Sequence, residues 1–287
     1  MRSLLFKKIS YLLRLSHWSK ACFVLLGVLY AGKSEYWLSA LGAAFAFCLV
    51  ASAVYIYNDL QDLEEDRAHP IKSQRPLAEG SVSPIVAKRV LWVCLGAGIL
   101  QGVFMSWVLL LILSIYLLIN LFYNHGVRCV PLLDVICIAS GFLLRVLAGT
   151  VGIGLPISWW LCVAATLLSL FIALCKRRLE MTMKQTIRTV LHRYSPQILD
   201  RLIVVVASGC FITYLLYTIY ARSERAFFLG TLPFAALGLW RFAVLSLEQD
   251  PSTKPHNDDP IALFLSDALS RINGLFFIVF TLMAVMQ

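Results

Sequence analysis

The residues best suited to chemistry form an acidic run at the end of a long apolar stretch. Five carboxylates fall within eight positions: Asp59, Asp62, Glu64, Glu65 and Asp66. On a continuing helix, positions 59, 62 and 66 have i, i+3, i+7 spacing and share one face. Carboxylates held this close repel one another unless a cation lies between them, and hard oxygen ligands suit Mg²⁺. We therefore predict Asp59, Asp62 and Asp66 as catalytic, metal-binding residues, with Mg²⁺ as the cofactor.

A basic segment that contains prolines follows the acidic run. Residues 67–80 read RAHPIKSQRPLAEG, and its two prolines prevent one continuous helix. The segment must fold back as a loop, which can return Lys72 and Arg75 to the carboxylates. Arg holds phosphate with a bidentate fork and Lys acts as a point charge, so both are candidate phosphate ligands. The alternative is that these cations only set the membrane topology.

The elements that must position these residues are membrane-spanning helices. The 287 residues are 60% hydrophobic and 14% charged, with a mean hydropathy of +0.79, well outside the averages for soluble domains. We predict an all-α membrane protein, a single domain over 1–287, because a hydrocarbon core of about 30 Å needs about 20 apolar residues per crossing. The nine stretches of this kind are 16–32, 37–58, 84–104, 107–123, 132–151, 157–176, 199–220, 227–246 and 266–286. The acidic run then lies at a membrane boundary, where a purely solvated role is unfavourable.

The distribution of basic residues predicts the orientation. Of 25 Lys and Arg residues, 21 fall on one side of the nine predicted spans, three fall on the other, and Arg145 lies inside the fifth span. By the positive-inside rule, the N-terminus and the acidic run face the cytoplasm. We expect a multi-pass protein of the inner (cytoplasmic) membrane, in contact with membrane lipids. Topology explains most of the net charge of +9, so no nucleic-acid partner is required.

The run NDLQDLEEDRAHPIKSQRPLAEG (58–80) resembles the first signature of the UbiA prenyltransferase superfamily, NDxxDxxxD followed by a basic loop. It is most similar to the decaprenyl-phosphate phosphoribosyltransferase branch, in which NDxxDxxxDRxHPxKxxRPxAxG is typical. Four further segments resemble features of that branch: RLSHWSK (14–20), YNHGVR (123–128), GFLLRVLAG (141–149) and KRRLE (176–180). Directly after the first of these segments, this chain has Ala21 where the branch has Asn. The resemblance covers nearly the whole chain.

This resemblance implies a UbiA-like bundle of nine transmembrane helices with a polar cavity open to the cytoplasm. It also implies a reaction, the transfer of 5-phosphoribose from phosphoribosyl pyrophosphate to a polyprenyl phosphate lipid of the decaprenyl type, with release of pyrophosphate. The substrate-binding residues that it suggests are Lys20, Asn58, Arg67, Lys72, Arg75, Tyr123, Arg128, Asp134, Lys176, Arg177 and Glu180.

The second half of the implied site differs from that of typical aromatic prenyltransferases. Those members carry a second acidic motif after the sixth span, where this chain has Lys176 and Arg177. A cationic wall suits a substrate with several phosphate groups; the alternative is charge that sets topology. Two roles remain open for Asp134: it contacts the metal or the ribose, or it is a charge at the start of a helix. Arg145 needs an anionic partner, since a lone charge inside a span costs at least ~2.5 kcal/mol, and its role is open between structure and function.

Two other functions compete with this hypothesis. One is prenyl transfer from a prenyl diphosphate to an aromatic acceptor within the same superfamily. The other is lipid or ion transport, which the clustering of acids at one face and the lack of an obvious inverted repeat disfavour. Asp258 and Asp259 could close over the substrate, but we expect them to begin the ninth helix. Walker-type loops, Ser/His/Asp sets and zinc-ligand spacings are not found, and a homo-oligomer is left open.

Overall fold

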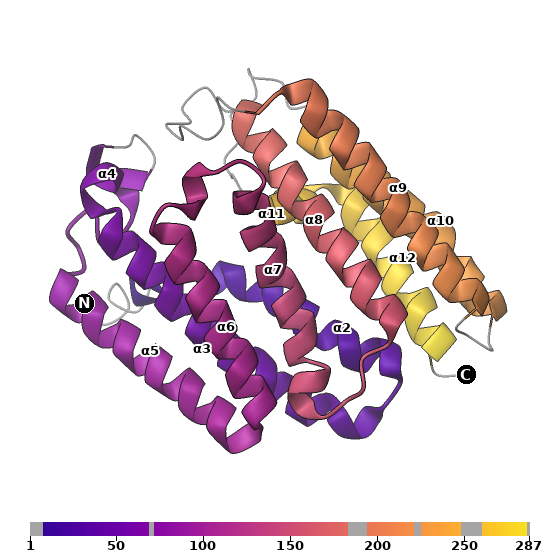
Figure 1. The fold of residues 1–287 in the computed structure, drawn as a ribbon, viewed down its shortest axis with the longest axis horizontal. Helices are drawn as coiled ribbons and strands as arrows, with labels where there is room; N and C mark the ends of the chain where they lie inside the picture. Colours follow the sequence, from indigo (N-terminus) through magenta and orange to yellow (C-terminus); the bar gives the residue numbers. More distant parts are fainter. Residues whose placement is uncertain (1–7, 69–71, 183–193, 221–224, 248–259, 286–287) are drawn as a thin grey trace. The chain divides into compact units, whose positions relative to one another are not determined.

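The fold is entirely helical in the part of the chain that the computed structural model describes, residues 8–68, 72–182, 194–220, 225–247 and 260–285 (Figure 1). The α-helices are α2 Cys22–Ala31, α3 Trp37–Gln61, α4 Leu63–Ala68, α5 Pro84–Met105, α6 Trp107–Asn124, α7 Leu133–Ala148, α8 Trp159–Thr182, α9 Pro196–Tyr220, α10 Arg225–Leu247, α11 Pro260–Ser266 and α12 Ala268–Val285. Short 3₁₀ helices are η1 Leu15–Ala21, η2 Ser34–Tyr36, η3 Lys72–Gln74, η4 Val127–Cys129 and η5 Val151–Ile153. The all-α prediction is confirmed.

Within the described residues, eight helical segments are long and apolar enough to cross a membrane: Ser34–Gln61, Pro84–Met105, Trp107–Asn124, Leu133–Ile153, Trp159–Met181, Pro196–Tyr220, Phe227–Leu247 and Ala268–Val285. They coincide with the second to ninth predicted spans to within a few residues. Large apolar side chains also face outward, for example Trp92, Val93 and Phe104 on α5. Outward apolar side chains are the pattern expected when the solvent is lipid, and the chain is a multi-pass integral membrane protein.

The first predicted span differs from the other eight. Residues Leu15–Ala31 form a shorter apolar helix, in which seven residues of 3₁₀ helix (η1) precede ten residues of α-helix (α2). A 3₁₀ helix rises about 2.0 Å per residue and an α-helix about 1.5 Å, so the two together extend about 29 Å. The tighter winding therefore brings 17 residues close to the thickness of a hydrocarbon core.

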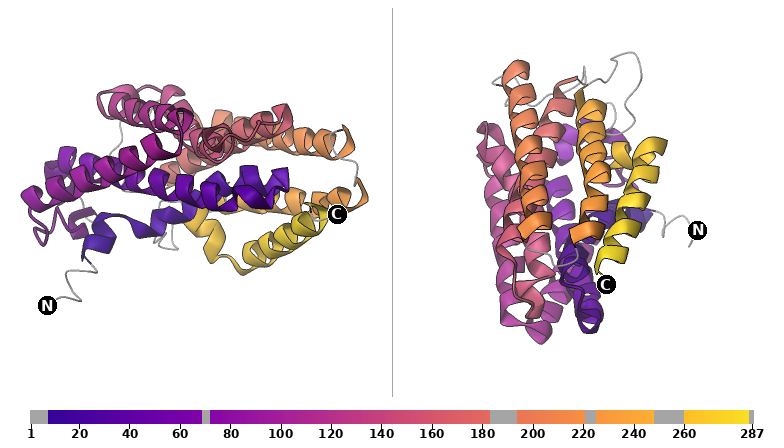
Figure 2. Two further views of the ribbon diagram at one scale, coloured as in Figure 1. Left: turned by 90° about the horizontal axis from the view of Figure 1, so that it is seen from below. Right: turned by 90° about the vertical axis from the view of Figure 1, so that its right-hand side faces the viewer.

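The chain divides into two compact units that interleave in the sequence. Unit 1 comprises residues 1–28, 33–124 and 144–156, and unit 2 comprises residues 29–32, 125–143 and 157–287. In unit 1, α3 packs against α5 and α6. The small residues of α3 allow this close packing, with Ala43, Ala46 and Val50 fully buried around Phe47. In unit 2, α8, α9, α10 and α12 pack side by side (Figures 1 and 2).

A contact between glycines joins α2 to the end of α7 within unit 1. A Cβ atom placed on Gly149 would lie 1.7 Å from the carbonyl oxygen of Val24, and one on Gly27 would lie 2.8 Å from the carbonyl oxygen of Gly149. Both distances are far below van der Waals contact. Small residues let helix backbones approach this closely in membranes, where close packing replaces the hydrophobic drive between helices.

We predict that Gly149→Ala destabilises the protein by at least about 1–3 kcal/mol, because the neighbouring atoms are backbone atoms that cannot turn away. Gly96→Ala is the matched control, because a Cβ there meets nothing within 4 Å. That change should be neutral or stabilising by up to about 1 kcal/mol. Thermal unfolding of the two variants in detergent measures the difference, and equal transition temperatures would contradict the close contact.

Candidate active site

The acidic run lies where α3 meets α4. Helix α3 ends at Gln61 and the chain bends at Asp62 before α4 begins. Two backbone hydrogen bonds carry the helical path across the bend, from Asp62 N–H to Asn58 O (2.9 Å) and from Asp66 N–H to Asp62 O (2.8 Å). Asp59 and Asp66 are almost completely buried, at 4% and 1% exposure. Their carboxylates therefore need counter-charges.

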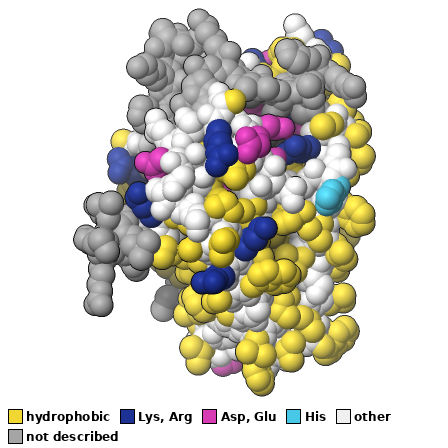
Figure 3. All heavy atoms as spheres, turned by 90° about the vertical axis from the view of Figure 1, so that its left-hand side faces the viewer, with side chains coloured by type: hydrophobic (Ala, Val, Ile, Leu, Met, Phe, Trp, Pro, Cys, Tyr) yellow, Lys and Arg dark blue, Asp and Glu magenta, His cyan; other side chains and the backbone are white. Residues whose placement is uncertain are grey.

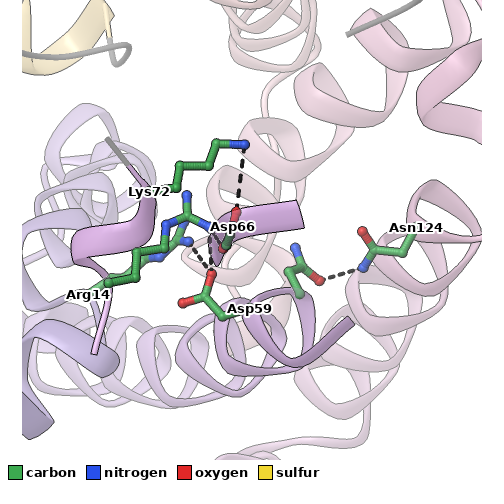
Figure 4. A network of polar contacts seen from close by, with 7 residues as sticks. Arg14, Asp59, Asp66, Lys72 and Asn124 are labelled. Atoms are coloured by element: carbon green, nitrogen blue, oxygen red, sulfur yellow. Dashed lines mark hydrogen bonds and ion pairs between the residues drawn. The ribbon is translucent and has the colours of Figure 1, made fainter. Parts of the chain in front are cut away.

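Arg75 supplies a bridge between Asp59 and Asp66, the two carboxylates labelled in Figure 4. Its Nη1 atom donates to Asp59 Oδ1 at 3.0 Å and to Asp66 Oδ2 at 2.6 Å. Lys72 Nζ lies 3.9 Å from the other Asp66 oxygen, Oδ1. The predicted return of the basic loop to the acidic run is confirmed for both cations. Charged side chains also gather in the upper part of the face in Figure 3, whereas hydrophobic side chains cover most of its lower part.

Arg14 supplies a second guanidinium group next to the Asp59 carboxylate. Its Nη2 atom donates to Asp59 Oδ1 at 2.6 Å, and its guanidinium carbon lies 4.8 Å from the centre of the Tyr55 ring. The backbone beside it is anchored to α3, because Ser52 Oγ donates to Leu13 O at 2.8 Å and Trp18 Nε1 donates to Ser52 Oγ at 3.1 Å. Ser52, Tyr55 and Asp59 are spaced i, i+3, i+7 and share one face of α3.

The donor chemistry of this cluster fits a divalent cation. Among the described residues, Asp66 Oδ1 is buried without a hydrogen-bond donor, and carboxylate oxygens are the ligands that Mg²⁺ prefers. The described part of the chain has no group of three His, Cys, Asp or Glu side chains that already converges on one point. In this conformation Arg14 and Arg75 contact the Asp59 carboxylate, and Arg75 and Lys72 contact that of Asp66.

The other predicted residues of unit 1 lie in different surroundings. Asn58 accepts a hydrogen bond from the side-chain amide of Asn124, at the end of α6 (Figure 4). Arg67 forms an i, i+3 pair with Glu64 at 3.0 Å on the exposed side of α4. Lys20 is buried in the last turn of η1. Tyr123 is partly buried in the last turn of α6, next to Asn124.

A second polar cluster lies within unit 2. Arg177 is fully buried; its Nε atom lies 2.5 Å from Asp134 Oδ2, and its Nη1 atom pairs with Glu180. Tyr194 donates its hydroxyl proton to Asp134 Oδ1 at 2.5 Å and accepts the Leu132 backbone N–H at 2.7 Å. Burial and the hydrogen bond to Asp134 raise the pKa of Tyr194 to about 12. The tyrosine therefore stays protonated, and able to donate, throughout the neutral range.

Sequence reasoning grouped Lys176 and Arg177 in one cationic wall, but the structure separates them. Arg177 faces two carboxylates in the interior, whereas Lys176 is partly exposed. Arg178 pairs with Asp200 of α9 at 2.6 Å, and Arg128 is partly exposed in η4. The difference has a simple cause, since successive residues of a helix point about 100° apart.

Arg145 lies in the last turn of α7, in unit 1, and is 6% exposed. Its guanidinium lies 4.8 Å from the centre of the Phe47 ring and 5.4 Å from that of Tyr116. Cation–π contact of this kind is favourable where water is excluded. Arg145 also lines a cavity of about 10 Å³ with Trp18 and Tyr55, large enough for about one water molecule.

Three residues of these clusters were not among the predicted site residues: Arg14, Asn124 and Tyr194. Arg14 and Asn124 stand inside segments that the sequence singled out (14–20 and 123–128), but their partners are 45 and 66 residues away. Tyr194 carried no signal of its own. Asp258 and Asp259 lie outside the described residues.

Comparison with known proteins gives this architecture a family. The model of the UbiA prenyltransferase family matches residues 21–266, and the chain therefore belongs to that family. Among solved structures, a UbiA homologue from Archaeoglobus fulgidus bound to DMAPP and Mg²⁺ superposes with a TM-score of 0.71 at 18% identity. That match covers 97% of this chain and 99% of the other, and it supports the UbiA-like fold.

Two relatives that carry the same name are similar to this chain in sequence. The chain is 34% identical over 143 residues to decaprenyl-phosphate phosphoribosyltransferase of Mycolicibacterium smegmatis and 32% identical over 216 residues to that of Corynebacterium glutamicum. The matches cover 50% and 71% of this chain. They span only 45% and 65% of the relatives' own lengths.

We predict that Arg177→Met destabilises the protein by about 3–5 kcal/mol, because Asp134 and Glu180 would stay buried without their cation. Lys176→Met removes the same charge from the preceding, partly exposed position. Its effect should stay within about 0.5 kcal/mol. Thermal unfolding and size-exclusion profiles in detergent compare the two variants, and equal stability would show that the buried ion pairs contribute nothing.

Proposed function

We propose that this protein transfers 5-phosphoribose from phosphoribosyl pyrophosphate to a polyprenyl phosphate and releases pyrophosphate. The proposal is supported by relatives that carry the name decaprenyl-phosphate phosphoribosyltransferase at 32–34% identity. It is also supported by the basic sequence of residues 176–178, where the superfamily's aromatic prenyltransferases have a second acidic motif.

The observation that carries the proposal is the charge balance at the end of α3. Three cations, Arg14, Lys72 and Arg75, lie within 3.9 Å of the oxygens of two carboxylates, Asp59 and Asp66. Counted with Asp62, the third carboxylate assigned to the metal below, the cluster is balanced before any metal binds and becomes net positive once a divalent cation is bound. Excess positive charge in a mostly buried site favours a ligand with several negative charges, such as a sugar phosphate with a pyrophosphate group.

The residues of the chain then act by binding and orientation. A phosphate oxygen of the lipid attacks C1 of the ribose, the bond from C1 to the pyrophosphate oxygen breaks, and pyrophosphate leaves with the electron pair. Lys72 and Arg75 hold phosphate groups in place. Arg177 has a positioning role, because its ion pairs hold Asp134 and Glu180 in place. A covalent intermediate on the enzyme is not required.

A divalent cation belongs to the same proposal. Asp59, Asp62 and Asp66 would hold Mg²⁺, and the metal would supply neutralisation of the charge that develops on the leaving pyrophosphate. Asn58, which accepts a hydrogen bond from Asn124, would help to orient the ribose. This assignment requires the guanidiniums now at Asp59 and Asp66 to move.

A substrate comparison tests the function. Purified protein with Mg²⁺ should convert phosphoribosyl pyrophosphate and polyprenyl phosphate into a lipid-linked product and pyrophosphate, and EDTA should abolish turnover. A parallel reaction receives geranyl diphosphate and an aromatic acid. Turnover of only the second pair would replace the proposed donor with a prenyl diphosphate, the alternative within the same family.

We also propose that the N-terminus and the loop after α4 face the cytoplasm, where a water-soluble phosphorylated donor is available. The 21-to-3 division of basic residues supports this orientation. Reporter fusions within the loop 69–83 should report a cytoplasmic location, and a periplasmic signal there would contradict the orientation.

A further inference from the structure

We propose that Arg14 and Arg75 are exchangeable counter-ions of the acidic run. They neutralise Asp59 and Asp66 while no divalent cation is bound, and they turn to the phosphate groups of the substrate when the cation arrives. This inference rests on the proposed use of a divalent metal and a phosphorylated donor. It adds that the metal and the anion are bound by an exchange of partners within one cluster.

The geometry shows what is exchanged. One oxygen, Asp59 Oδ1, accepts from Arg14 Nη2 at 2.6 Å and from Arg75 Nη1 at 3.0 Å, and the same Arg75 nitrogen is 2.6 Å from Asp66 Oδ2. The nitrogen therefore stands between the carboxylates of Asp59 and Asp66. A Mg²⁺ ion that bridges them needs oxygens at about 2.1 Å, so the nitrogen and the metal cannot occupy that position together.

Charge balance gives the exchange its direction. Two buried carboxylates need about two positive charges, and the guanidiniums supply them. When a divalent cation is held by Asp59, Asp62 and Asp66, the metal and the three carboxylates together carry one negative charge, and Arg14, Lys72 and Arg75 leave the cluster with a surplus of two positive charges. That surplus is unfavourable alone and favourable beside a polyanion, so metal and anion should strengthen each other's binding. Coupling between two sites is typically 5–150-fold.

Arg14 is suited to such a change, because its backbone is fixed while its side chain is partly exposed. Ser52 holds the Leu13 carbonyl, and Arg14 itself has left-handed backbone angles (φ 51°, ψ 51°), which a residue with a side chain keeps only when its surroundings impose them. The Arg14 side chain is 21% exposed, against 5% for Asp59. The guanidinium can therefore leave the carboxylate without movement of the helix.

Binding of Mn²⁺, a paramagnetic probe that accepts the same oxygen ligands, tests the proposal on the full-length protein in detergent without phosphate. Arg14→Gln removes one competitor for Asp59, and its Mn²⁺ affinity, followed by electron paramagnetic resonance, should rise at least about tenfold over wild type. Arg89→Gln is the matched control, since Arg89 is an exposed cation at the start of α5, and its affinity should match wild type.

Arginine labelling separates partner exchange from a general effect of charge. Phenylglyoxal modification of the wild-type protein, read by mass spectrometry, should increase at Arg14 and Arg75 when Mn²⁺ is added and stay constant at Arg89. This measurement needs no variant, so it decides the matter even if Arg14→Gln fails to fold. Bound Mn²⁺ with unchanged labelling would overturn the exchange alone, whereas no Mn²⁺ binding would overturn the proposed metal use and the exchange with it.

Discussion

A carboxylate inside an apolar bundle is stable only when a cation accompanies it, and both polar clusters of this protein follow from that constraint. Asp59 lies in the last turn of α3, whose buried residues are mostly small and apolar, and it is buried with Asp66. The free energy of removing such groups from water is recovered only by close, well-oriented partners. This requirement explains why the basic loop folds back onto α4 and why the segment before η1 is fastened to α3 through Ser52.

The two clusters meet the constraint in opposite ways. In unit 1, the carboxylates are buried and their partners, Arg14 and Arg75, keep about a fifth of their side-chain surface in contact with solvent. In unit 2, the cation is the buried group, because Arg177 is fully enclosed between Asp134 and Glu180. Partners that reach solvent can be replaced by a ligand, whereas an enclosed cation with two carboxylates is a fixed part of the structure. The first cluster is therefore suited to binding and the second to support.

Sequence reasoning succeeded where a single local property decides the outcome. Eight of the nine predicted spans match helices that can cross a membrane, because hydropathy over about 20 residues responds directly to the thickness of the bilayer. The return of Arg75 to the acidic run was predictable, since prolines force a short loop. The pairing of Arg14 with Asp59 was not, because its two partners are 45 residues apart. The separation of Arg177 from Lys176 was missed too, since no pattern in the sequence states which side of α8 faces inward.

The 3₁₀ winding of η1 sets the rotational phase of the helix that follows it. A 3₁₀ helix turns about 120° per residue and an α-helix about 100°, so the three residues of η1 that follow Trp18 accumulate a difference of about 60°. The anchor at Trp18 and the glycine contact at Gly27 lie on either side of the junction between η1 and α2. Rewinding η1 as an α-helix would turn Gly27 away from Gly149 while Trp18 stayed on Ser52. The winding of η1 thus sets the helix rotation that allows both contacts, the one at Trp18 and the one at Gly27. An insertion or deletion of one residue there would break one of these contacts even if every apolar residue were kept.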